Sequence, residues 1–244
     1  NTKMTKYNVR FNGDLNISNR LTAATNFSFT YYDHLIKDQG MTPKTNPLYL
    51  AQTKAPFLNT NEVDNVGNVS PNRADTDIFG ISNPVAVIEN MFNSSKAYRF
   101  FGTIAFNYKL SSTLNLGTIV GITFDKAREQ RFVPRKGVAN DTLPNAIADS
   151  RLAGNVKRIS NLYNETFFVY IKKLNPLHQF QLKTGLRYMN ATNEQDLQIG
   201  YNSATDDFIS VGTGINTLRK VGGDIGKSAW INYYLSANYT YNNK

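Results

Sequence analysis

Few side chains in this sequence have the types and the spacing that catalysis requires. The 244 residues include two histidines, His34 and His178, and no cysteine. Thiol catalysis, disulfides and cysteine-based metal sites are therefore excluded. Neither histidine has a second histidine at metal-ligand spacing, and no Gly-x-Ser-x-Gly motif occurs. We expect both histidines to be solvated or interfacial, and we predict neither enzymatic activity nor a cofactor.

Two further segments carry ligand-like side chains at incomplete spacing. Residues 222–228 end in Gly-Lys-Ser but lack the first glycine of a phosphate-binding loop, and we expect no helix after them. Residues 64–68 offer Asp and Asn oxygens, but no glutamate follows at the twelfth position of a calcium loop. We predict ordinary loops at both places, with calcium binding at 64–68 as the open alternative.

The elements that must position any functional group are β-strands with one apolar and one polar face. From residue 7 to residue 17 the odd positions are Tyr, Val, Phe, Gly, Leu and Ile, while the even positions are polar. Residues 21–31 repeat this alternation after a short polar break. A period of two predicts strands. Each arm has about the 9–11 residues with which a tilted strand crosses a bilayer.

The alternation returns along the chain and predicts seven strands in all. The later arms are 98–110, 114–125, 163–171, 179–188 and 231–241. Short breaks at 18–20, 111–112 and 175–177 alternate with long segments at 33–96, 127–158 and 191–227. Within the first long segment, a helix is expected over 84–92, with Val85, Ile88 and Met91 on one face.

The third hairpin alternates less cleanly than the first two. We place residues 163, 167, 169 and 171 on one face, and Phe168 and Tyr170 on the opposite face.

This order of short turns and long loops is typical of outer-membrane β-barrels, whose short turns are periplasmic and whose long loops are extracellular. Tyr and Trp near strand ends fit the aromatic girdles of such barrels. These residues are Tyr7, Tyr31, Tyr32, Tyr98, Tyr188, Trp230, Tyr239 and Tyr241. Open strand edges are costly in lipid, so other strands of the same barrel must pair with the two ends. We predict an all-β fold, an antiparallel up-and-down transmembrane β-barrel segment of about seven strands.

Composition agrees with a two-faced sheet. The mean hydropathy is −0.41, yet the chain has 14 Tyr and 15 Phe. The net charge is +9, and a basic chain is typical of proteins that bind nucleic acid. The cations are spread singly along alternating strands, without a basic helix, so we predict no nucleic-acid partner.

Several phrases of the sequence resemble the SusC/RagA-type TonB-dependent outer-membrane transporters of Bacteroidetes. The phrases are NPLYLA at 46–51, KAPFL at 54–58, FGISNP at 79–84, IEN at 88–90, YRFFG at 98–102, GITFDK at 121–126 and RFVP at 131–134. The likeness is most specific from residue 46 to residue 137. Beyond that range the agreement lies in strand rhythm.

The resemblance implies a barrel of about 22 strands, plugged by an N-terminal domain. It implies energy from TonB, ExbB and ExbD through an N-terminal box, and a SusD-like surface lipoprotein that helps capture oligosaccharides or peptides. No plug-like region occurs in this sequence. We therefore expect residues 1–244 to be one part of a single barrel domain, with the plug and the remaining strands outside it.

Two groups of residues are the candidates for function. If the polar face lines the lumen, six charged residues would contact substrate or plug: Arg10, Asp14, Arg99, Asp125, Lys183 and Arg187. In the loops, Tyr49, Phe57 and Phe79 are candidates for contact with a ligand or with the lipoprotein. Plain hydration and loop packing are the alternatives for both groups.

Two other classes of protein compete with the transporter. An extracellular β-sheet adhesin or glycan-binding protein would bury the apolar faces against a second sheet. An outer-membrane protease or lipase would need a catalytic group that includes a histidine such as His34.

Overall fold

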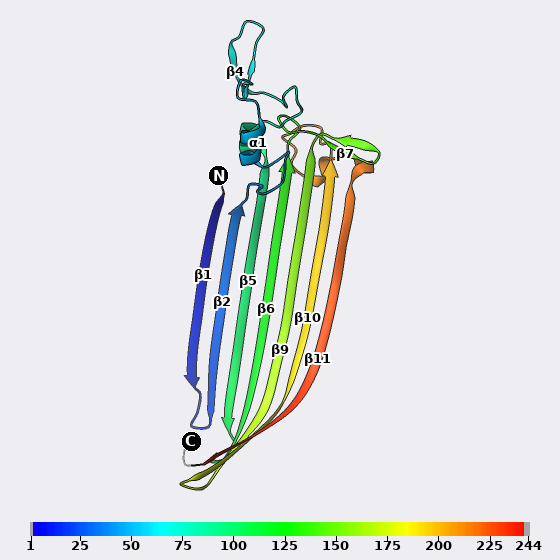
Figure 1. Cartoon of the computed structure of the whole chain (residues 1–244). Coiled ribbons are helices and arrows are strands. Elements are labelled where there is room, and N and C mark those ends of the chain that lie inside the picture. The colour runs from blue at the N-terminus through cyan, green and yellow to red at the C-terminus, as the bar shows by residue number, and fades with distance from the viewer. Residues whose placement is uncertain (1, 242–244) are drawn as a thin grey trace.

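Seven long antiparallel strands form one continuous sheet in the computed structural model, which describes residues 2–241 (Figure 1). Their order is β1-β2-β5-β6-β9-β10-β11. The bounds are β1 Lys3–Asn16, β2 Leu21–Leu35, β5 Phe92–Lys109, β6 Leu114–Val133, β9 Arg151–Asn175, β10 His178–Tyr201 and β11 Lys220–Tyr241. Each strand pairs with the next long strand along the chain, so the topology is up-and-down. The predicted all-β barrel-wall segment of seven strands is confirmed.

The three predicted short turns lie together at one end of the sheet, and the longer connections lie at the other end (Figure 1). The connections over 36–91, 134–150 and 202–219 form what we call the loop cap. It contains α1 Pro47–Thr53, β3 Asn61–Val63, β4 Val69–Arg73, α2 Pro84–Asn90, β7 Asp141–Leu143, β8 Ala146–Ala148, η1 Val211–Thr213 and η2 Asn216–Leu218.

The long strands run further toward the loop cap than predicted. The second long segment was predicted over 127–158, but β6 and β9 pair over both of its ends, up to Val133 and Arg151. The third was predicted over 191–227, but β10 continues to Tyr201 and β11 starts at Lys220. The alternation fades there because both faces carry polar residues. Backbone hydrogen bonding between strands does not need an apolar face, so the pairing continues.

The grouping of residues predicted for the third hairpin is confirmed, and the structure decides which of its two faces is the apolar one. Phe168 of β9 pairs with Leu116 of β6, so it lies on the face that carries the apolar residues of the first two hairpins. Residues 163, 165, 167, 169 and 171 lie on the opposite, mainly polar face. The sequence left this choice open, because β9 has aromatic residues on both faces and its alternation alone does not choose between them.

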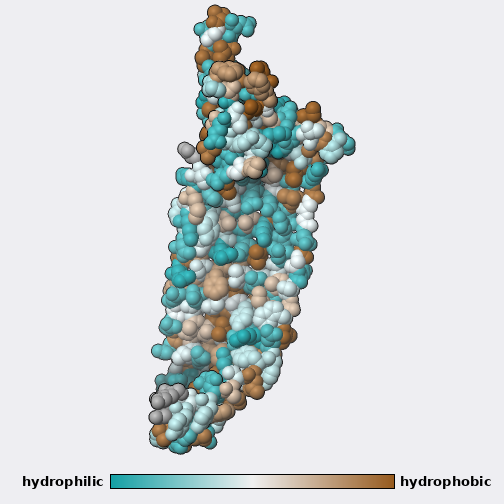
Figure 2. Space-filling view, viewed as in Figure 1, coloured by the Kyte–Doolittle hydropathy of each residue, from teal (hydrophilic) through white to brown (hydrophobic). Residues whose placement is uncertain are grey.

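The apolar face of the sheet is not covered by a second layer among the described residues. Val9 is 66% exposed and Leu235 is 64% exposed. Val120, on a central strand, is 38% exposed, and Phe27, Ile104 and Leu182 are partly exposed. Figure 2 shows the molecule as viewed in Figure 1, with mostly hydrophilic residues over the visible part of the sheet and hydrophobic residues gathered on the loop cap.

Three aromatic residues form a row on the apolar face near the loop cap, across β1, β2 and β5. Tyr7 pairs with Tyr31, and Tyr31 pairs with Tyr98. The rings of Tyr7 and Tyr31 stack with their centroids 6.4 Å apart. Two aromatic residues predicted for such rows, Tyr32 and Trp230, lie on the polar face instead. Both have even numbers, whereas the apolar face of β2 and β11 is formed by odd-numbered residues.

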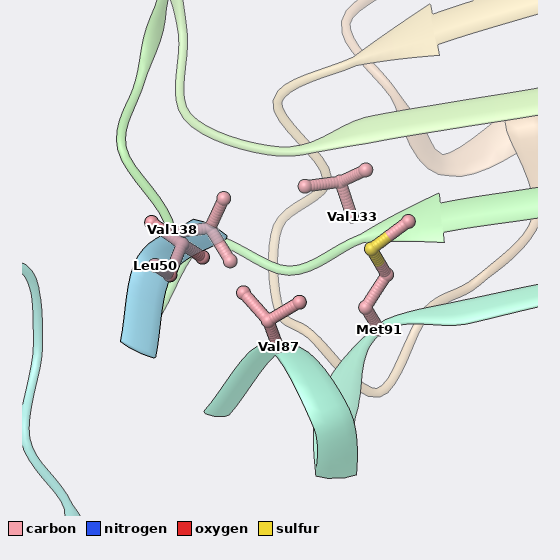
Figure 3. Close-up of a cluster of buried hydrophobic side chains, with 5 residues drawn as sticks. All are labelled: Leu50, Val87, Met91, Val133 and Val138. Atoms are coloured by element: carbon pink, nitrogen blue, oxygen red, sulfur yellow. The ribbon is translucent and has the colours of Figure 1, made fainter. Parts of the chain in front are cut away.

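The loop cap has a small hydrophobic core of its own. It consists of Leu50, Val87, Met91, Val133 and Val138 (Figure 3). The predicted helix at 84–92 is present as α2, but its buried residues are Pro84, Ala86 and Val87. Of the predicted face only Met91, which follows the helix, is buried. The helix α1 was not predicted, although it begins with the same Asn-Pro pair as α2.

Asparagine-proline pairs begin both helices of the loop cap. The side chains of Asn46 and Asn83 accept hydrogen bonds from backbone N–H groups of the first turn, and a proline follows each of them. The last carbonyls of α2 are bound by Lys37, whose Nζ donates to Ile88 O at 2.7 Å and to Met91 O at 2.8 Å. Burial lowers the pKa of Lys37, and the nearby Asp38 carboxylate opposes this effect.

Candidate functional site on the polar face

All six predicted charged residues lie on one face of the sheet. In one row, Asp14 pairs with Ala24 and Glu165 pairs with Arg187. Two rows further toward the loop cap on the same face, Arg10 pairs with Ser28. In the row after that, Arg99 pairs with Asp125. Side chains of partnered residues share a face, so the strand pairing places the six residues together on the polar face.

Arg99 and Asp125 form a bidentate ion pair between β5 and β6. Arg99 Nε and Nη2 each donate to a carboxylate oxygen of Asp125 at 2.8 Å. The Arg99 side chain is 64% exposed, so water screens the pair and its contribution to stability is small. Both groups remain accessible to a polar ligand on this face.

The densest polar cluster centres on Glu165, which was not among the predicted residues. Glu165 is only 6% exposed. Its carboxylate accepts hydrogen bonds from the hydroxyls of Tyr163 and Tyr234, each at 2.5 Å. Lys183 Nζ lies 3.5 Å and Arg187 Nε lies 3.3 Å from its oxygens. Two predicted residues, Lys183 and Arg187, are therefore held by a carboxylate that had not been singled out.

Aromatic rings complete this group, which we call the Glu165 cluster: Tyr163, Glu165, Phe167, Lys183, Arg187 and Tyr234. Lys183 Nζ lies 4.1 Å from the centroid of the Phe167 ring. The Arg187 guanidinium lies 4.6 Å from the centroid of the Tyr234 ring. Such cation–π contacts orient cations that stay partly open to solvent. The cluster therefore places two cations and three aromatic rings on the polar face.

Two glycines make room for the Phe167 ring. A Cβ at Gly117 would lie 2.3 Å from Phe167 Cζ. A Cβ at Gly185 would lie 2.7 Å from both Phe167 Cβ and Tyr234 Oη, and 2.9 Å from the backbone oxygen of Thr166. Any side chain at these positions would push the ring or the tyrosine out of place.

We expect Gly185→Ala to destabilise the sheet by about 1–3 kcal/mol, the usual cost of overpacking a close contact. The matched control is Gly154→Ala on β9, because a Cβ there would meet nothing within 4 Å. The measurement is the urea unfolding midpoint of each variant of the intact protein. Equal midpoints for the two variants would show that the Phe167 contact is loose.

The Glu165 cluster could have been recognised from one feature of the sequence. Glu165 is an acidic residue inside an arm rich in aromatics, between Tyr163 and Phe167. The role of Glu165 depends on which face of β9 is the polar one, and the sequence left this open. The hydrogen bond from Tyr234 to Glu165 depends on the pairing of β11 with β10 and on its register.

The three predicted loop aromatics are exposed on the loop cap. Tyr49 is 41% exposed, Phe57 is 78% exposed and Phe79 is 64% exposed. Leu48 and Ile78, their sequence neighbours, are also largely exposed. None of these five side chains belongs to the core in Figure 3.

The two remaining candidate segments, residues 64–68 and 222–228, have structural roles. Asp64 Oδ1 accepts from the backbone N–H groups of Val66 and Asn68 at the turn between β3 and β4, and Gly67 has a φ of 93°. The hydrogen bond from the Asn68 side chain is the main reason that the pKa of Asp64 is lowered. The segment predicted as a Gly-Lys-Ser loop is part of β11 instead, because it pairs with β10.

The histidines stand apart from each other. His178 lies at the turn end of β10 against the rings of Tyr239 and Tyr241, and His34 pairs with Met4 on β1. Over residues 2–241, no three His, Cys, Asp or Glu side chains gather as a metal site would require. Across the same residues, no helix has the length and apolarity to cross a membrane.

Solved structures with a similar fold exist. The chain matches one titled "Structure of the RagAB peptide transporter" with a TM-score of 0.72 at 13% identity. It matches the RagAB peptide importer in its "closed-closed" state with a TM-score of 0.71 at 13% identity, and in its "open-open" state with 0.69 at 14% identity. Each match covers 99% of this chain and 26% of the other chain. No protein-family model and no curated protein matches the sequence.

At this level of identity the likeness establishes the fold alone. The chain spans about a quarter of the length of the solved chains that it matches. The predicted up-and-down sheet of seven strands is thus shared with these solved chains. The activity, cargo and partners of the whole protein are matters for proposal.

Proposed function

We propose that this chain is a wall segment of a TonB-dependent outer-membrane transporter of the SusC/RagA type, from a Gram-negative bacterium of the Bacteroidetes. Its cargo would be peptides or oligosaccharides. The observation that carries the proposal is the division of a seven-stranded up-and-down sheet into an uncovered apolar face and a polar face. The fold likeness to the RagAB peptide transporter supports it.

The height of the apolar face agrees with a membrane-spanning wall. On β5 the apolar positions run from Tyr98 to Tyr108, and on β6 they run from Leu114 to Phe124. A run of about eleven residues, tilted by about 40°, rises about 25 Å, which is the height of the apolar band of outer-membrane barrels. The remaining residues of these strands would extend the wall beyond the membrane toward the loop cap.

The polar face and the loop cap supply the two contacts that import requires. Over the polar face, the Glu165 cluster and the Arg99–Asp125 pair would meet a polar cargo or the plug. On the loop cap, Tyr49, Phe57 and Phe79 offer an exposed apolar surface to a SusD-like lipoprotein. TonB, ExbB and ExbD would act through parts of the protein outside residues 1–244. In this role the segment performs no catalysis and needs no cofactor.

The adhesin alternative lacks support from the sheet. A β-sandwich buries its apolar faces against a second sheet. In residues 2–241 the two other sheets are small hairpins of the loop cap, so the apolar rows stay uncovered.

Val120→Arg and Thr123→Arg on β6 test the membrane-facing wall. Val120 is on the apolar face and Thr123 is on the polar face of the same strand. In a barrel, arginine on the lipid face near the midplane costs about 2–4 kcal/mol, whereas the lumen face tolerates it. We expect Val120→Arg alone to reduce the amount of heat-modifiable, folded full-length protein in outer membranes, and peptide uptake with it.

The same experiment has a clear negative outcome. If the two arginine variants fold equally well, the apolar face does not meet lipid and the transporter proposal fails. If the two variants differ as expected but the wild-type protein takes up neither peptides nor oligosaccharides in the presence of its lipoprotein, the wall is correct and the proposed cargo is wrong.

A further inference from the structure

Cations gather on the apolar face of the sheet, directly next to its apolar rows on the loop-cap side. Four of them, Lys96, Lys126, Arg128 and Arg158, lie on three neighbouring strands, and we call them the basic belt. Lys96 of β5 pairs with Arg128 of β6, and Lys126 of β6 pairs with Arg158 of β9. The strand pairing therefore places the four cations in two adjacent rows.

The two outer cations of the belt already have carboxylate partners. Lys96 Nζ lies 3.5 Å from an oxygen of Asp33. Arg158 lies 3.3 Å from oxygens of both Glu194 and Asp196. These acidic residues flank the belt on β2 and β10 and limit its positive potential to the central strands.

The two central cations have no carboxylate partner. Neither Lys126 nor Arg128 forms an ion pair with any residue of the described chain. Lys126 Nζ lies 5.9 Å from the centroid of the Tyr98 ring. The two residues are two positions apart on β6, so their side chains point the same way about 7 Å apart. This spacing suits one anionic group held between them.

A groove lies over these cations. Its volume is about 430 Å³, and its lining includes Lys126, Arg128 and Arg158. Residues 209–211 of the loop cap form another part of the lining. The groove is therefore bounded by the sheet and by the third connection, and its lining is more polar than the face beside it.

Apolar side chains continue from the belt toward the turn end of the sheet. Phe100 pairs with Phe124 in the next row, and both side chains are more than a third exposed. Ile122, in the row after that, is 48% exposed. A ligand that fills this whole surface needs an anionic head and an apolar body. A free phosphate ion would use only the cations.

We propose that the basic belt binds the phosphorylated headgroup of a membrane lipid whose acyl chains lie along the adjoining apolar rows. The inference rests on the proposed function, because it requires the apolar face to meet a bilayer. Lys126 and Arg128 bind the phosphate, and the Phe100 and Phe124 rings contact the chains. The ion pairs of Lys96 and Arg158 hold the edges of the site.

The test measures lipid binding by the full-length protein in nanodiscs that contain either phosphorylated lipid A or its dephosphorylated form. The variant is Lys126→Ala with Arg128→Ala. The matched control is Lys157→Ala, since Lys157 is next to Arg158 on β9 but lies on the polar face. We expect the double variant to bind phosphorylated lipid A about 10- to 30-fold more weakly. The reason is that each cation near a membrane surface raises the affinity for anionic lipid about tenfold or less. The control should bind as the wild type does.

Three results would overturn the proposal. They are equal binding by the double variant and the control, equal binding of the phosphorylated and dephosphorylated lipids, and full competition by millimolar inorganic phosphate. The last would assign the belt to a free ion. Heat-modifiable mobility of each variant shows that it is folded. Failure of the Val120→Arg test removes the transporter wall itself, whereas its success together with equal lipid binding removes only the lipid site.

Discussion

Asn83→Ala is expected to unfold the loop cap locally while the long sheet stays paired. Asn83 is fully buried, and its side chain joins three segments of the loop cap. Nδ2 donates to Thr60 O at 2.7 Å and to Ala74 O at 2.8 Å. Oδ1 accepts from Val85 N at 3.1 Å and from Ala86 N at 3.4 Å, which caps α2.

The expected loss is about 2–4 kcal/mol. Removing an N-cap costs about 1 kcal/mol, and leaving Ala74 O without its donor costs about 1–3 kcal/mol. Thr60 O still accepts from the backbone N–H of Ala74 at 3.0 Å. The measurement is amide hydrogen exchange of α2 in the full-length protein, which should become much faster. Exchange in β5 and β6 should change little, because the strand pairing does not depend on Asn83.

A matched control is Asn65→Ala, at an exposed asparagine in the turn between β3 and β4. It should leave exchange in α2 unchanged. If Asn83→Ala also leaves α2 protected, the loop cap is held by its hydrophobic core in Figure 3 rather than by this side chain.

Glu165→Gln is expected to weaken the sheet where β9, β10 and β11 meet. The carboxylate accepts from two tyrosine hydroxyls and lies between Lys183 and Arg187. The amide keeps the volume but removes the negative charge and one acceptor oxygen. Two neighbouring cations are then left without a counter-charge, and one tyrosine hydroxyl faces an N–H donor.

The expected cost is about 1–3 kcal/mol, the usual range for unsatisfied buried polar groups. The partial exposure of the two cations keeps it at the lower end, because water can rehydrate them. The measurement is the urea unfolding free energy of the full-length protein in detergent. Glu129→Gln is the matched control, since Glu129 is exposed on the same face and its carboxylate accepts one hydrogen bond, from Asn155 at 3.2 Å.

A compensating variant separates charge balance from packing. Glu165→Leu combined with Lys183→Met and Arg187→Met removes the carboxylate and both cations, and such apolar replacement of buried charges is often neutral or stabilising. It should be more stable than Glu165→Leu alone. If the combined variant is no better, the loss arises from the tyrosine hydroxyls and the ring packing, not from unpaired cations.

The phrases that carry the family resemblance have a physical role in the loop cap. The Asn-Pro pairs at 46–47 and 83–84 start its two helices. Gly137, at the end of the resembling region, has a φ of 83°, and its N–H donates to Asp75 while its carbonyl accepts from Asn83 N. A Cβ at Gly137 would lie 2.4 Å from Ala86 Cβ. These phrases therefore specify how the first connection folds over the second.

The number of strands, their short turns and the two-faced character of the sheet were all determined by the sequence itself. Alternation of period two is a local property of the chain, and it was clear in β1, β2, β5 and β6. The turns at 18–20, 111–112 and 175–177 needed only local turn chemistry. The six charged candidates on the polar face were found by the same local rule, because each lies next to a clear alternation.

Only the tertiary structure decided the face of β9, the full length of β6, β9, β10 and β11, and the Glu165 cluster. Strand register is set by hydrogen bonds to a neighbouring strand, and a shift of one residue turns every side chain to the other face. The aromatic residues on both faces of β9 gave no local signal for that choice. Tyr163 and Tyr234 are 71 residues apart in the chain, and only the pairing of β9, β10 and β11 brings both hydroxyls to one carboxylate.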